Sequence, residues 1–177
     1  MALQPETVAH AALVGGSQTT LHSHAGGGGE SEIAIVATQD SSNATTSFAN
    51  ITDLSFTAAV GKTYIIEAWL VFQSNTAGCG IKFALNGPPS PAIVALIAHV
   101  PIALTLYASC VTLASRAYDT GTPSVSVDTI NANLLCKIDA LVKNGSTQGS
   151  VTLRFAAETT GTVKVMTGSV LRYRQVD

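Results

Sequence analysis

Short runs of apolar and β-branched residues, separated by Gly, Pro, Asn and Asp, make up most of the chain after Glu32. The strongest run is 63–72, TYIIEAWLVF, whose β-branched and aromatic residues suit a central and largely buried strand. The pattern predicts eight or nine strands and no helix in this part of the chain, at 33–37, along a bent stretch 45–58, at 63–72, at 80–85, on both sides of Pro101 within 92–114, and at 129–142, 150–157 and 163–176. Short strands joined by such turns indicate an all-β domain, a β-sandwich or a jelly roll.

The first 30 residues differ from the rest, because they are rich in small residues and glycine. The stretch Val8–Val14 follows Pro5 and ends at Gly15-Gly16, which is the pattern of a short helix. We therefore divide the chain into an arm, 1–30, with a glycine-rich hinge, and a β domain, 31–177. An arm this short cannot form a core of its own. We expect it to be held against a partner by four apolar residues, Pro5, Val8, Leu13 and Val14.

The arm ends in a histidine pair, Leu21-His22-Ser23-His24, followed by four glycines. His22 and His24 are two residues apart, so they lie on the same side of an extended chain. Three chains around a threefold axis would offer six nitrogens, an octahedral set that suits one first-row transition metal ion per trimer. Iron or nickel suits such a set better than zinc, which prefers four ligands. The alternative interpretation is a solvated linker that binds no metal.

The low charge of the chain narrows its possible partners. Charged residues make up only 11% of the chain, hydrophobic residues 46% and aromatic residues 6%, and the net charge is −2. Because no basic cluster is present, we expect no nucleic-acid partner. A chain with so few charges covers its surface with hydroxyls and amides, or hides that surface in subunit contacts. Its cysteines, Cys79, Cys110 and Cys136, lack metal-ligand spacing, so we expect free buried thiols, with an intermolecular disulfide left open.

The segment 92–114 is almost wholly apolar and long enough to span a bilayer. Pro101 in its middle, its β-branched residues and the lack of flanking positive charge favour two strands instead, and no membrane partner is expected. A strand that is apolar on both faces needs cover on both, and a trimer interface would supply the second cover. The predicted interface residues are Ile93, Val94, Leu96, Ile102, Leu104 and Leu106.

Four features in order carry a resemblance to a known family. They are the Leu-His-Ser-His segment with its glycines, ATTSFANITDLSFTAAVGKTYIIEAWLVF at 44–72, an Asn-Gly-Pro turn at 86–88, and the closing GSVLRYRQV at 168–176. This profile resembles small structural proteins of tailed-bacteriophage virions, of the decoration, head-fibre and tail-fibre type. The resemblance implies a trimeric jelly roll of the tumour-necrosis-factor-like sort, a location on the virion, and a structural role. His22 and His24 match the His-x-His pairs with which trimeric phage fibres bind metal on their axis.

The chain departs from long fibre tips because it has a single His-x-His pair and no repetitive shaft. Both departures favour a homotrimeric decoration or head-fibre protein that is attached to the capsid by its N-terminal arm. The alternative is a tail-fibre or receptor-binding knob at the tail that binds a host surface glycan.

Sugar sites need exposed aromatic residues, and we expect Trp69 to lie in the core, which leaves Tyr107 and Tyr118 as candidates. An enzyme is not expected, because no nucleophile-elbow or paired-carboxylate pattern is present and His99 is expected to be a core residue on an apolar strand.

Overall fold

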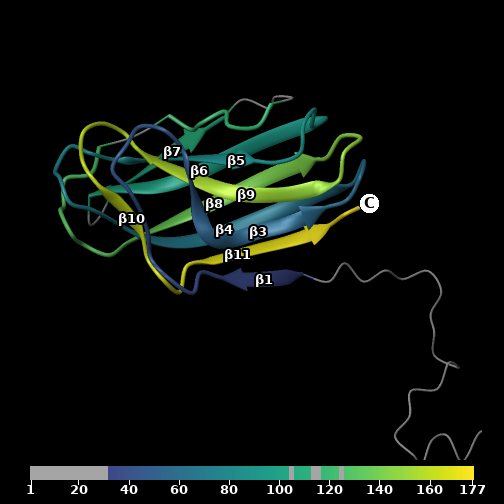
Figure 1. Ribbon diagram of the computed structural model, residues 1–177. Coiled ribbons are helices and arrows are strands. Elements are labelled where there is room, and N and C mark those ends of the chain that lie inside the picture. The colour runs from purple at the N-terminus through teal and green to yellow at the C-terminus, as the bar shows by residue number, and fades with distance from the viewer. Residues whose placement is uncertain (1–31, 104–105, 113–116, 124–125) are drawn as a thin grey trace, which may run out of the picture.

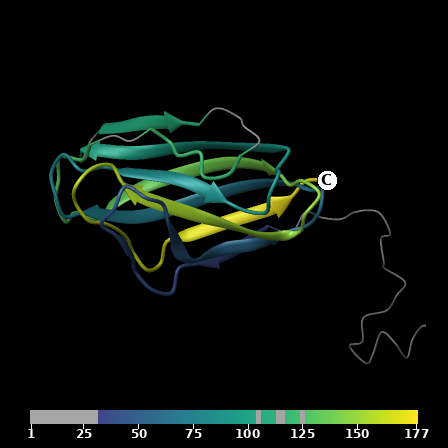
Figure 2. The same ribbon diagram turned by 45° about the horizontal axis from the view of Figure 1, so that its top comes forward.

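The computed structural model describes residues 32–103, 106–112, 117–123 and 126–177. In these ranges the chain forms two antiparallel sheets that face each other, as two views show (Figure 1, Figure 2), and it contains no helix. The strands are β1 (Ile33–Val36), β2 (Ser41–Asn43), β3 (Ala49–Ala58), β4 (Thr63–Ser74), β5 (Ile81–Asn86), β6 (Ile93–Ala103), β7 (Leu106–Val111), β8 (Leu134–Lys143), β9 (Gly149–Ala157), β10 (Val163–Val165) and β11 (Val170–Gln175). The all-β prediction is confirmed as an antiparallel β-sandwich. No helix in the described ranges is long and apolar enough to cross a membrane.

The larger sheet has the strand order β1-β11-β4-β8-β6-β7, and β10 joins it by pairing with β4 and β2. The smaller sheet has the order β3-β9-β5. As predicted, the run TYIIEAWLVF forms a central strand, because β4 pairs with β11 on one side and β8 on the other. Along β4 every second side chain is buried and the others are partly exposed. The strand is therefore buried on one face only.

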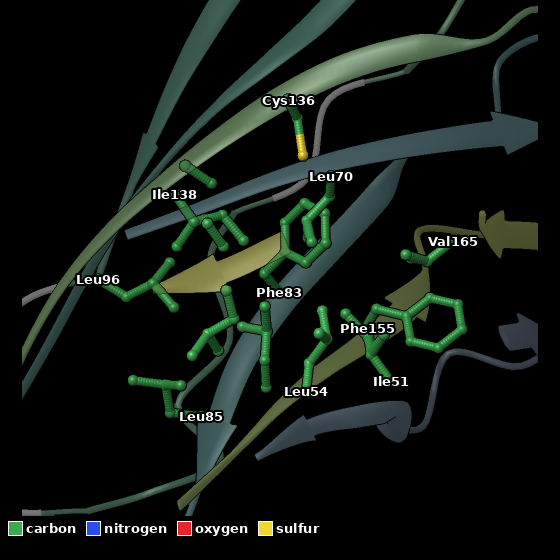
Figure 3. Packing of buried hydrophobic residues seen from close by; sticks show 14 of the residues in the cluster. Ile51, Leu54, Leu70, Phe83, Leu85, Leu96, Cys136, Ile138, Phe155 and Val165 are labelled. Carbon is green, nitrogen blue, oxygen red and sulfur yellow. The ribbon is translucent and has the colours of Figure 1, made fainter. Parts of the chain in front are cut away.

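The core fills the space between the two sheets. Phe72 and Leu70 of β4 pack there with Phe83 of β5 and Phe155 of β9, and none of the four is exposed to solvent. Figure 3 shows side chains from both sheets, Ile138 among them, pointing toward one another in this layer. The core forms because each strand presents one row of apolar side chains, and the rows of the two sheets interdigitate.

Several predicted strands have different bounds from those expected. The division of the apolar segment was predicted at Pro101, but β6 continues through this residue to Ala103, with a register shift against β7 there. The strand predicted at 129–142 begins only at Leu134.

In the bent stretch 45–58, residues 49–58 form one strand, β3, with a register shift between Asn50 and Ser55. Within it, Asp53 adopts a φ of 69° and accepts a hydrogen bond from the Thr38 backbone N at 3.0 Å. The hydrogen bonds from Thr38 hold the pKa of Asp53 below its ordinary value.

The closing stretch 163–176 was predicted as a single strand and is divided into β10 and β11. Gly168, at a φ of 82°, makes the turn between them, and its N donates to Ala37 O at 2.9 Å. The residues predicted as a polar turn at 40–43 contain β2, which pairs with β10. β2 consists of three polar residues and pairs only with β10, so it has no apolar pattern that would distinguish it from a turn.

A loop after β7 covers the open edge of the smaller sheet. The Asp119 N donates to Leu85 O at 2.7 Å, the Thr122 N donates to Phe83 O at 2.8 Å, and the Phe83 N donates to Thr122 Oγ1 at 3.1 Å. Asp119 also forms an ion pair with Arg154, at 2.6 Å between Oδ1 and Nη1. The edge of β5 therefore does not expose a free row of backbone groups at these positions.

The three cysteines are free and buried, as expected. They contribute to the core through packing, since Cys79 and Cys136 are fully buried among apolar neighbours. Burial raises the pKa of the Cys136 thiol and of the Cys110 thiol, which keeps both protonated at neutral pH.

Asn144 offers a test of the fold at the turn between β8 and β9. Its buried Nδ2 donates to the backbone oxygens of Ala58, Ala59 and Thr147 at 3.2, 2.9 and 2.9 Å. We expect Asn144→Ala to lower the free energy of unfolding by about 2 kcal/mol, because buried carbonyls lose their donor. Urea unfolding measures this loss. As a control, Asn133→Ala removes an exposed asparagine and should change the free energy by less than about 0.5 kcal/mol; equal effects would contradict the structural role of Asn144.

Candidate functional site

Several residues predicted to be functional lie outside the described residues. These are the histidine pair, the four arm residues and one interface residue: His22, His24, Pro5, Val8, Leu13, Val14 and Leu104. Their predicted roles in metal binding, attachment and subunit contact stay predictions.

The other predicted interface residues point in different directions. Val94 and Leu96 of β6 are 6% and 2% exposed, and they belong to the core of this chain. Ile102 is partly exposed, while Ile93 and Leu106 are exposed. The face of β6 that points toward the smaller sheet is therefore already buried. The side chains of β6 that could contact a second chain are the alternate ones, which point away from the core.

Those alternate side chains belong to the outer face of the larger sheet, which we define as the side opposite the core. Across β4, β8 and β6 the register aligns Trp69 with Lys137 and then His99. The next row aligns Glu67, Asp139 and Ile97. Side chains two residues apart share a face of a strand, so these two rows lie side by side on the outer face.

Trp69 is part of this face, and its predicted place in the core is wrong. Its side chain is partly exposed, and two cations lie over its ring: Lys137 Nζ at 5.7 Å and Arg172 Cζ at 5.1 Å from the centroid. Lys137 comes from β8 and Arg172 from β11, the two neighbours of β4, so the cations approach from opposite sides. Both contacts have the geometry of a cation–π interaction.

The signal that places Trp69 outside was present in the sequence. Glu67 stands two residues before it in the same strand, and a charged residue two positions away marks the same face as the solvent side. The run is apolar on average, and this average hides the alternation between inward and outward side chains.

Ion pairs surround the tryptophan. Lys137 Nζ lies 2.9 Å from Asp139 Oδ1 and 3.9 Å from Glu67 Oε1, and Arg172 Nη1 lies 3.0 Å from Glu32 Oε1. The hydrogen bond to Asp139 is the main cause that raises the pKa of Lys137 above its ordinary value. These side chains are all between one third and one half exposed, so each pair by itself contributes little to stability.

His99 was expected in the core and is also on the outer face. Its side chain is 42% exposed, its Nε2 lies 3.9 Å from Asp139 Oδ2, and its Nδ1 is 3.0 Å from Ser109 Oγ of β7. His99 is therefore the last residue of the row formed by Trp69, Lys137 and His99, at the point where β6 pairs with β7. Within the described ranges, no group of three or more His, Cys, Asp or Glu side chains is arranged to hold a metal ion.

Apolar side chains adjoin the charged rows. A shallow hollow of about 380 Å³ is lined by Ile65, Ala95, Ile97, Val111 and Leu141, with Glu67 and Asp139 at its side. Of these apolar residues, Ile97, Leu141 and Val111 are 39%, 38% and 50% exposed. A second, polar hollow shares Ile65 and Glu67 with it and extends to Arg172, Arg174 and Glu32. The outer face therefore combines large exposed apolar groups with paired charges, the composition of a surface that contacts another molecule.

The two tyrosines considered for glycan binding lie in different surroundings. Tyr107 on β7 is 56% exposed. Tyr118 is packed against the core, its hydroxyl is buried, and burial raises its pKa to about 12. Tyr107 is thus the more exposed of the two, while Tyr118 is only partly exposed.

Comparison with known proteins yields distant neighbours. No family model and no curated protein matches the chain. Among solved structures, the chain is similar to the VP2 subviral particle of infectious bursal disease virus, with 12% identity and a TM-score of 0.27, over 84% of this chain and 40% of that one. It is also similar to a structure of the Gx strain of that virus, with 15% identity and a TM-score of 0.20, over 82% of this chain and 38% of that one. The chain spans well under half the length of both, and similarity at this level carries no argument about function.

The ion pairs of Lys137 predict how its pKa changes when one of the carboxylates is removed. We expect Asp139→Asn to lower the pKa of Lys137 toward its ordinary value, because the mutation removes the carboxylate that lies 2.9 Å from Nζ. Glu67→Gln should lower it less, since that carboxylate is 3.9 Å away. Titration of the lysine side chains by NMR above about pH 9 measures both changes. Lys164, which pairs with Asp40, is the internal control and should not shift; a larger effect of Glu67→Gln would contradict the geometry.

Proposed function

We propose that this chain is a structural protein of a tailed-phage virion, a homotrimeric decoration or head-fibre protein that its N-terminal arm attaches to the capsid. One observation carries the proposal: a β-sandwich of low charge leaves large apolar side chains exposed on the outer face of its larger sheet. The profile of Leu-His-Ser-His, the 44–72 segment and the closing GSVLRYRQV supports the phage assignment. A protein that acts by assembling with copies of itself and with a particle needs contact surfaces of this kind.

The order of the strands supports a jelly roll as the specific form of the sandwich. From β3 to β6, and again from β8 to β10, successive strands alternate between the two sheets. We interpret the order β1-β11-β4-β8 against β3-β9-β5 as a jelly roll with one strand missing from the smaller sheet. The β6–β7 hairpin instead extends the larger sheet, and residues 119–122 lie along β5 at the vacant position.

The arm is the proposed attachment segment, because it carries almost no charge and is too short to form a core of its own. Deletion of residues 1–30 should therefore leave a folded domain that no longer binds particles, while the full chain decorates them. Low-resolution images of particles with and without the protein, together with circular dichroism of the shortened chain, test this. Full decoration by the shortened chain would place the attachment in the β domain and contradict the proposed role of Pro5, Val8, Leu13 and Val14.

A receptor-binding knob at the tail is the second candidate. It is favoured by Tyr107, an exposed aromatic side chain at the edge of the larger sheet, because aromatic side chains at the surface are the usual platforms for sugar rings. Images that show the protein at the tail, with binding to a host surface glycan that is lost in Tyr107→Ala, would favour this candidate over the capsid protein.

We also propose that His22 and His24 of three chains hold one transition metal ion, iron or nickel rather than zinc, on the trimer axis. Elemental analysis of the purified protein should then give one metal ion per three chains, and none in a His22→Ala/His24→Ala variant. Because only neutral imidazole binds metal, the metal content should fall as the pH drops below about 6.5. A His10→Ala variant, which keeps the pair, is the matched control. Absence of metal at neutral pH without chelator would identify the pair as a linker.

A further inference from the structure

We propose that copies of this chain associate through the outer face of the larger sheet, with the rows around Trp69 and Asp139 at the centre of the contact. The occupant of this face is a second copy of the same chain. The inference rests on the proposed homotrimer and names the surface that builds it.

The first argument is the distribution of exposed apolar side chains. Of the large hydrophobic residues exposed in the described ranges, Ile97, Val111, Leu135 and Leu141 belong to the outer face through the register of β8, β6 and β7. Three of them, Ile97, Val111 and Leu141, line the shallow hollow together with partly exposed Ile65, while Leu135 lies beyond the charged rows, opposite Val71 of β4. A continuous apolar area of this kind is unfavourable in water and marks a surface that another molecule covers.

The second argument is the balance of charge on the same face. Lys137, Arg172 and Arg174 carry positive charge, and Glu32, Glu67 and Asp139 carry negative charge, so the six groups are neutral as a whole. Lys137 and Arg172 each lie beside a carboxylate. A strongly acidic or basic partner would meet as much repulsion as attraction here, whereas another copy of this chain, with a net charge of −2, is neither strongly acidic nor strongly basic.

The third argument is the way the face holds Trp69. Lys137 and Arg172, from the two strands that flank β4, both lie over its ring, and these contacts restrict the side chain before any partner arrives. Large aromatic and arginine side chains near the centre of a contact contribute most of the affinity, and fixing them in advance lowers the entropy lost on association. Arg172 and Trp69 together meet this description.

This inference changes only part of the predicted interface on β6 and β7, because Ile93 lies on the same outward row of β6 as Ile97. Val94 and Leu96 face the core of their own chain, while Ile97 and Val111, one position out of phase with them, face outward. The proposed contact therefore uses the opposite row of β6 and continues across β8 and β4 to β11.

The experiment compares single substitutions in the full chain. Leu141→Asp and Ile97→Asp place a carboxylate in the proposed contact, and Val60→Asp places one at a turn residue that is 52% exposed and outside the face. Sedimentation at micromolar concentration should give a trimer for the wild type and for Val60→Asp. It should give monomers for the two face variants, because a buried unpaired charge weakens association by at least about 100-fold. Circular dichroism and urea unfolding confirm that each variant is folded.

Trp69 supplies a second readout, since the chain has a single tryptophan. Quenching of its fluorescence by acrylamide should be weak in the wild-type trimer and several-fold stronger in the folded face variants. A trimer that survives both substitutions with unchanged quenching overturns the inference and leaves the proposed homotrimer intact. A wild type that is monomeric, with readily quenched Trp69, overturns both. Loss of the trimer on deletion of residues 1–30, with both face variants still trimeric, would identify the arm as the contact instead.

Discussion

The fold depends on the alternation of side chains along β4. This strand pairs with β11, β8 and β10, so it connects most of the larger sheet, and its inward row, which includes Leu70 and Phe72, meets the smaller sheet. A shift of one residue would exchange the two rows and put Glu67 and Trp69 into the core. The core therefore fixes the register of β4, and the register fixes which groups of β8 and β11 stand beside Trp69 on the other side.

This dependence explains how far the sequence could be interpreted. The all-β class and the approximate positions of β4, β5, β8 and β9 follow from apolar runs and from the turn residues between them. The division at Gly168 and the short strand β2 depend on contacts with residues far away in the chain, such as Ala37 and Lys164, which local patterns do not contain. The same holds for the pairing of β6 with β8 in the larger sheet.

The candidate site was harder to predict than the fold. Trp69 and His99 were assigned to the core because their neighbours in sequence are apolar, yet both belong to the row that faces outward. The alternation of residues along β4 was enough to place Trp69 on the outer face. The placement of His99 involves a contact with Ser109 on the neighbouring strand, which is not visible in the sequence of β6 alone. The grouping of Lys137, Asp139 and Arg172 around Trp69 arises only when three strands are aligned, and one sequence carries no information about that alignment.

The structure of the Asn144–Gly145 turn affects the chemical stability of the chain. Asparagine deamidates readily when glycine follows it, because the glycine nitrogen can attack the side-chain carbonyl carbon, close a ring and release ammonia. Here the Asn144 amide is held by three backbone oxygens, and the Gly145 N donates to its Oδ1 at 3.0 Å. Ring closure would first have to break these contacts and move a buried side chain. The contacts that shape the turn therefore also slow the deamidation of Asn144, which is an advantage for any protein that must persist without being replaced.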